Sequence, residues 1–311
     1  MRRATWRGTL VALSFAMALA LPSVARGYAF LLVEGGGGAV LRWQPQRFVD
    51  ARIPWFVTAS VDGGLLGERT FADVVAAAFG RWETVTESAI AFDFRGVLDR
   101  RDRDPGDGRN LVGFADGSTL GSGVLGATFL TSDADGHITD ADIVLSRAVE
   151  FTTGVEAAAG VYDAESVLTH EIGHLLGLDH TGLVRATMAP FTDRGDVHQR
   201  TLELDDAIGA AILYPEGGFP EGRAALAGTV SRDGRGVFLA HVVATTIQGR
   251  VVASGYTRPD GTYRIEGLPP DVYLVHAERL DGPVRPSNVA GVREGFGQAE
   301  TTDYETTFHY E

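Results

Sequence analysis

Three histidines with a fixed spacing are the residues of this sequence best suited to chemistry. His170 and His174 are four residues apart, and His180 follows six residues later. Side chains four residues apart leave the same face of a helix, so both imidazoles can reach one metal ion at ~2.0–2.1 Å. Gly177 can adopt a left-handed conformation that ends the helix and brings His180 back as a third ligand. Three protein ligands leave a fourth position for water, which is typical of a catalytic zinc site.

Glu171 and Met188 extend this pattern. Glu171 directly follows the first histidine, where it can act as a general base on water at the metal. Met188 lies eight residues beyond His180, in a stretch flanked by glycine and proline. Two histidines at this spacing also arise by chance on amphipathic helices with surface histidines. The third histidine and the turn glycine favour the zinc site over that alternative.

The extended motif followed by a methionine turn resembles the metzincin metallopeptidases. The short run from His180 to Met188-Ala189-Pro190 resembles the matrixins in particular. Residues 202–209 and Leu213-Tyr214 are similar to the last helix of a matrixin catalytic domain, so the resemblance covers about residues 50–215. It implies an α+β catalytic domain in which a twisted mixed sheet carries an active-site helix and a C-terminal helix.

The resemblance also implies a role for each residue of the motif. A zinc ion on the three histidines would polarise the scissile carbonyl, and Glu171 would move a proton from water to the leaving amine. Met188 would form a hydrophobic floor under the ligands. Asp205 or Asp206 would tether that turn from the last helix, although helix capping is the alternative role for either aspartate. Ala189 stands where matrixins usually carry an aromatic residue, which leaves the side-chain preference of the specificity pocket open.

Hydrophobic periodicity predicts the elements that position these residues. An amphipathic helix is expected at Phe71–Thr86 and a second helix at Ala164–Leu176, with Thr70 and Asp163 as N-caps. The expected strands of this part are Arg52–Ser60, Ile90–Phe94, Val124–Thr131 and Ile143–Leu145. Matrixins line the substrate cleft with an edge strand that pairs with the peptide, and the resemblance places that strand at Gly123–Phe129.

The segment after that strand carries several carboxylates. Its Asp-Gly pair between two β-prone runs predicts a hairpin, and clustered carboxylates also suit calcium. We favour the hairpin and keep as the alternative a calcium loop with the ligands Asp133, Asp135, Asp140 and Asp142. Animal matrixins hold a second, structural zinc in this region with three histidines and an aspartate. Because His137 is the only histidine between Arg95 and Phe151, we predict no structural zinc.

A second domain is predicted after a linker that ends near Glu221. Short strands separated by turn signals follow between Ala225 and Glu278, which is typical of an all-β sandwich. Within them, Thr257–Pro270 resembles the carboxypeptidase regulatory-like (transthyretin-like) domain. The expected organisation is a signal peptide at 1–27, an N-terminal segment at 28–49, a peptidase domain at 50–216, and a β-sandwich with an acidic tail at 222–311.

Composition and charge restrict the function further. Residues 1–27 are similar to a secretory signal, because arginines precede an apolar run that is short for a membrane span; an uncleaved anchor is the alternative. The 311-residue chain has a net charge of −14, which disfavours electrostatic binding to nucleic acid. It has no cysteine, so it lacks disulfides and the thiol that keeps many matrixins latent.

We therefore expect a secreted zinc endopeptidase with Zn²⁺ as cofactor and Ca²⁺ as a candidate second ion. It would be a monomer located outside the cell, in the extracellular matrix or the periplasm, and it would act on peptides or proteins. It would have no nucleic-acid partner, and no membrane span after signal removal. Two alternatives remain: a non-catalytic secreted protein that binds through the β-sandwich, and a metal hydrolase acting on a non-peptide bond. Glu171 argues against the first, and the expected edge-strand cleft argues weakly against the second.

Overall fold

The computed structural model describes residues 28–33, 39–59, 65–100, 103–115, 120–156, 158–289 and 307–309. The expected signal segment at 1–27 and most of the acidic tail lie outside these residues. Among the described residues, no helix combines the length and apolar character needed to cross a bilayer.

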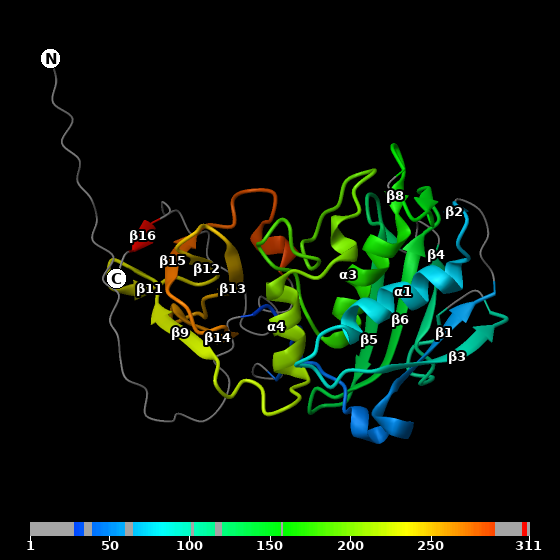
Figure 1. Cartoon of the computed structure of the whole chain (residues 1–311), viewed down its shortest axis with the longest axis horizontal. Helices are drawn as coiled ribbons and strands as arrows, with labels where there is room; N and C mark the ends of the chain where they lie inside the picture. Colours follow the sequence, from blue (N-terminus) through cyan, green and yellow to red (C-terminus); the bar gives the residue numbers. More distant parts are fainter. Residues whose placement is uncertain are drawn as a thin grey trace, which may run out of the picture.

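A five-stranded mixed sheet is the frame of the first part of the chain (Figure 1). Its strands are β1 (Ile53–Thr58), β3 (Phe92–Leu98), β4 (Leu111–Ala115), β5 (Gly126–Ser132) and β6 (Ile138–Ser146). Their order is β3-β1-β4-β6-β5, and β5 is antiparallel to β6 while the other pairs are parallel. The hairpin predicted between β5 and β6 is confirmed. Because β5 is the last strand, one of its edges has no strand partner in the described sheet.

Helices α1 (Phe71–Glu83) and α3 (Ala164–Leu176) pack against each other and against this sheet. The apolar face predicted for the first helix is confirmed, since its buried residues are Phe71, Val74, Val75, Ala78, Phe79 and Trp82. Thr70 caps α1 through a reciprocal pair of hydrogen bonds with Asp73. The Trp82 indole N–H donates to the carbonyl of Thr169 at 2.9 Å, which joins α1 to the middle of α3.

Three short parallel strands pair beside the N-terminus of α3: β2 (Leu65–Leu66), β7 (Phe151–Thr152) and β8 (Tyr162–Asp163). Single turns of 3-10 helix occur at η1 (Pro45–Arg47), η2 (Val49–Ala51), η3 (His198–Arg200) and η4 (Pro286–Asn288). The last helix of the first part is α4 (Leu204–Leu213).

The C-terminal part consists of β-strands. They are β9 (Ala224–Thr229), β10 (Ser231–Arg232), β11 (Arg235–Gly236), β12 (His241–Thr246), β13 (Val251–Tyr256), β14 (Thr262–Leu268), β15 (Tyr273–Glu278) and β16 (Thr307–His309). A four-stranded sheet has the order β13-β12-β15-β16, and β14-β9 and β10-β11 form separate pairs. The α+β class with an added β domain is confirmed. The sandwich of the carboxypeptidase regulatory-like type and the domain boundaries stay predictions.

Helix α4 lies where the two parts meet (Figure 1). It packs on α3 and on strands β13 and β14 of the β domain. Ile208 of α4 and Ile265 of β14 belong to the same apolar core, which continues into the first part. The segment 28–33 also reaches this junction, because Tyr28 donates to the carbonyl of Glu266 at 2.9 Å and Leu31 donates to the carbonyl of Gly177 at 2.9 Å.

Candidate metal centre

Helix α3 is closed at both ends by the residues that the sequence suggests. The Asp163 carboxylate accepts the amide of Ser166 at 2.8 Å and caps the N-terminus. Gly177 ends the helix with a φ of 99°. A β-carbon at Gly177 would lie 2.1 Å from the carbonyl oxygen of Leu41, so both the conformation and the space require glycine. The chain therefore turns sharply after His174.

The turn brings His170, His174 and His180 together. The Nε2 atom of His180 lies 3.2 Å from the Nε2 atoms of both other histidines. Two ligands at the tetrahedral angle, each ~2.0–2.1 Å from zinc, lie about 3.3 Å apart. The two distances to His180 thus fit ligands of one zinc ion, and the ligand atoms of all three histidines lie within 4.8 Å of one another.

The other ring nitrogen of each histidine contacts a backbone carbonyl oxygen. The Nδ1 atom of His170 lies 2.8 Å from the oxygen of Thr187, and that of His174 lies 2.8 Å from the oxygen of Leu178. His180 Nδ1 lies 2.5 Å from the carbonyl oxygen of Asn288. A carbonyl oxygen only accepts, so each Nδ1 carries the hydrogen and each Nε2 presents a lone pair.

Burial keeps these imidazoles neutral. It lowers the pKa of His170 to about 3, and it also lowers the pKa values of His174 and His180. Neutral imidazole is the form that binds metal. Three converging lone pairs repel one another unless a cation lies between them, so the arrangement suits a metal ion and not a hydrogen-bonded histidine cluster.

Glu171 lies on the same helix and is 4% exposed. Its Oε2 atom lies 2.7 Å from the Thr128 hydroxyl on β5, which is also 2.8 Å from the Glu171 carbonyl oxygen. Burial raises the pKa of the Glu171 carboxyl to about 7, although the Thr128 hydrogen bond opposes the shift. The site therefore holds a carboxylate that can exchange a proton near neutral pH.

Met188 lies beneath α3 and is 2% exposed. A β-carbon at Gly173 would lie 2.2 Å from its sulfur, so the close approach depends on that glycine. The Asp206 carboxylate holds the turn by accepting the amides of Thr187 at 2.8 Å and Met188 at 3.0 Å. Asp205 faces the β domain instead, where its carboxylate accepts the amide of Ser254 at 2.7 Å.

Replacing Asp206 with alanine should destabilise the protein by about 2 kcal/mol, because buried backbone N–H groups of the methionine turn would lose their acceptor. Urea unfolding of the wild type and the variant would measure the loss in free energy of unfolding. Asp193→Ala, at an exposed loop position, is the matched control and should stay within ~0.5 kcal/mol of the wild type. An equally small effect of Asp206→Ala would contradict this account of the turn.

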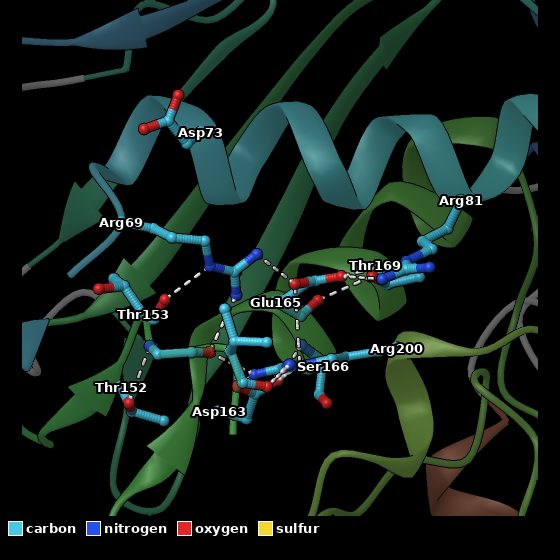
Figure 2. A network of polar contacts seen from close by, with 12 residues as sticks. Arg69, Asp73, Arg81, Thr152, Thr153, Asp163, Glu165, Ser166, Thr169 and Arg200 are labelled. Atoms are coloured by element: carbon cyan, nitrogen blue, oxygen red, sulfur yellow. Dashed lines mark hydrogen bonds and ion pairs between the residues drawn. The ribbon is translucent and has the colours of Figure 1, made fainter. Parts of the chain in front are cut away.

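A network of ion pairs fixes the N-terminus of α3 (Figure 2). The Glu165 carboxylate is 1% exposed and lies 2.7 Å from both Arg69 and Arg81. Arg200 pairs with Asp163 at 2.5 and 2.8 Å. The network thus joins α1, the loop before it and η3 to the helix that carries His170 and His174.

The four aspartates considered for calcium are divided between two places. Asp133 and Asp135 group with His137 at the hairpin turn. Asp140 accepts the amides of Gly106 and Gly108, at 3.0 and 2.9 Å. Asp142 accepts the amide of Leu111 at 3.0 Å on one oxygen. Calcium binding and the lack of a structural zinc stay predictions.

Some residues around the site carry no signal in the sequence. Thr128 reaches Glu171 from β5, and the Asn288 carbonyl reaches His180 from η4. Gln199 donates to the carbonyls of Thr187 and Ala189, at 3.1 and 2.9 Å, and supports the methionine turn. Each of these contacts depends on tertiary structure, and none belongs to a local motif.

Comparison with known proteins places this site in a family. The matrixin family model matches residues 48–215. Two Arabidopsis thaliana proteins, metalloendoproteinases 4-MMP and 5-MMP, are 33% and 36% identical over 144 and 162 residues. Those alignments cover 44% and 48% of this chain but only 38% and 40% of the relatives. A hatching enzyme of Paracentrotus lividus is 29% identical over 182 residues, which is 54% of this chain and 27% of that protein.

Proposed function

The chain belongs to the matrixin family, and from this premise we propose that it is a secreted zinc endopeptidase. The observation that carries the proposal is the convergence of three neutral imidazoles. The Nε2 atom of His180 lies 3.2 Å from the Nε2 atoms of His170 and His174. The Arabidopsis relatives named metalloendoproteinases support the same class. Secretion is inferred from the signal-like composition of residues 1–27.

In this proposal His170, His174 and His180 hold the zinc ion. When bound, the ion would supply Lewis-acid chemistry, polarising the scissile carbonyl and making water more acidic. Glu171 accepts the proton from the attacking water at its carboxylate and then delivers it to the leaving amine. Thr128 holds Oε2 of that carboxylate at 2.7 Å, so the base is already oriented before substrate binds.

The outer edge of β5 is the proposed binding surface for substrate. An extended peptide can pair with the free N–H and C=O groups of an edge strand. Gly126 opens the space beside the base, because a β-carbon there would lie 3.0 Å from Oε1 of Glu171. Met188 gives the ligands a packed floor, and Asp206 keeps that floor in place. Calcium at the aspartate groups remains an additional proposal.

Cleavage of an unfolded protein tests the function. The purified chain should degrade casein, a zinc chelator should abolish the activity, and one equivalent of added zinc should restore it. Metal analysis should find one zinc per chain, because no structural zinc is predicted. Zinc binding without casein cleavage would exclude general proteolysis and would favour a hydrolase for another bond or a binding protein. A chain that binds no zinc would contradict the proposed site itself.

A further inference from the structure

The third metal ligand is oriented from outside the family-matched region. His170 and His174 direct their Nδ1 atoms to carbonyls of the first part of the chain, within residues 48–215. His180 differs, because its Nδ1 atom lies 2.5 Å from the carbonyl oxygen of Asn288, 108 residues further along the chain. The acceptor for this ligand therefore comes from the segment that follows the last long strand of the β domain.

We infer that the C-terminal β domain is a positioning part of the metal centre, because the Asn288 carbonyl fixes the tautomer and the direction of His180. The inference rests on the proposed zinc site. A carbonyl acceptor behind a ligand histidine keeps the hydrogen on Nδ1 and aims the Nε2 lone pair at the metal. Zinc affinity should consequently depend on residues that contact neither the metal nor the substrate.

The segment that carries this carbonyl is held by packing. Asn288 ends η4, and its side chain accepts the backbone amide of Arg285 at 2.9 Å, which closes that turn. Val289 is 0% exposed. It packs in a small apolar cluster of buried residues with Ala29, Leu239, Tyr256, Leu280 and Val284. The carbonyl is therefore fixed on one side by a capped turn and on the other by a buried side chain.

The β domain also contacts the loop on both sides of the third ligand. The Thr181 hydroxyl lies 3.0 Å from the Ser254 hydroxyl, and the Tyr256 hydroxyl lies 3.4 Å from the His180 carbonyl oxygen. His241 fills the space over Gly182, where a β-carbon would lie 2.4 Å from the ring. These contacts from β12 and β13 make the loop after Gly177 part of the domain junction, so the domain is more than an appended module.

The full-length chain with Val289→Asp tests the inference, because a charge at this position should expel the segment from its apolar cluster. We expect zinc to bind ~10- to 100-fold more weakly, which is the usual loss when the partner behind a ligand is removed. The measurement is the transfer of zinc from the folded variant to a competing chromophoric chelator. Val272→Asp makes the same change in the β domain at a position that is 60% exposed, and it should leave zinc affinity unchanged.

Two further variants separate positioning from folding. Asn288→Ala removes the cap of η4 but keeps the carbonyl, so it should weaken zinc binding by about 3- to 10-fold without unfolding the domain. Val289→Ile keeps an apolar side chain and should bind zinc as the wild type does. For Val289→Asp and Asn288→Ala, excess zinc should restore kcat with KM unchanged, which a general loss of structure would not allow.

The outcomes distinguish this inference from the proposed function. Folded Val289→Asp and Asn288→Ala variants that bind zinc as tightly as the wild type would overturn the inference and leave the peptidase proposal intact. If Val289→Asp does not fold, Asn288→Ala decides alone by the same criterion. A wild-type chain that binds no zinc would overturn both.

Discussion

Replacing Glu171 with glutamine is expected to lower kcat for protein cleavage by ~10²–10⁴-fold, which is the usual contribution of a general base. The substitution preserves the shape of the side chain and an oxygen for the Thr128 hydroxyl, but it removes the group that accepts the proton. Zinc should stay bound at the wild-type stoichiometry, because Glu171 does not belong to the group of histidines that could hold the ion. The loss should therefore appear in kcat and leave KM nearly unchanged.

The control for this experiment is Glu216→Gln, an exposed glutamate just beyond α4, which should keep wild-type kcat. Zinc content of every preparation must be measured together with the rate. A Glu171→Gln enzyme that retains its zinc and more than a tenth of the wild-type kcat would show that another group takes the proton. Loss of zinc from this variant would instead assign Glu171 to the metal shell.

The local part of the site can be predicted from the sequence because its geometry follows from short-range rules. His170 and His174 share a helix face through their spacing, and Gly177 ends that helix by a conformation that few other residues adopt. The buried face of α1 follows from its apolar periodicity in the same way. The structure shows both features with the expected residues.

The rest of the site depends on contacts between distant segments. Strand β4 was not expected, since its five residues show no clear alternation next to a polar loop. The contacts of Thr128 with Glu171 and of Asn288 with His180 are likewise not predicted from the sequence. The partners are separated by 43 and 108 residues. Sheet order and domain docking create these pairs, and no spacing rule within one segment encodes them.

The ion-pair network at the start of α3 also joins residues that are distant in the sequence. We expect its loss to lower the stability of the protein strongly. Glu165 is the second residue of α3, a position where a carboxylate interacts favourably with the helix dipole. In the structure it is buried between the guanidinium groups of Arg69 and Arg81 (Figure 2). Arg200 lies at 3.8 Å and is paired mainly with Asp163.

Replacing Glu165 with glutamine is expected to destabilise the protein by about 3 kcal/mol at neutral pH. Removing one partner of a buried ion pair costs ~3–5 kcal/mol, and the low end applies here because the Arg69 and Arg81 side chains are 23% and 45% exposed. For a domain of this size the loss corresponds to a fall of roughly 6–12 °C in Tm. Asp93→Asn, which removes an exposed pair with Arg95 at 2.8 Å, is the control and should cost less than ~1 kcal/mol.

The pH dependence gives a second measurement of the same network. Burial disfavours the Glu165 carboxylate, but hydrogen bonds from Arg81 and Arg69 outweigh it and hold the pKa below the ordinary value of 4.5. The stabilisation is therefore complete above the pKa of the unfolded chain and is lost as the pH falls through the lower folded pKa. The difference in unfolding free energy between wild type and Glu165→Gln should shrink in that acid range. A constant difference from pH 7 to the acid limit of folding would show that Glu165 acts through packing and not through its charge.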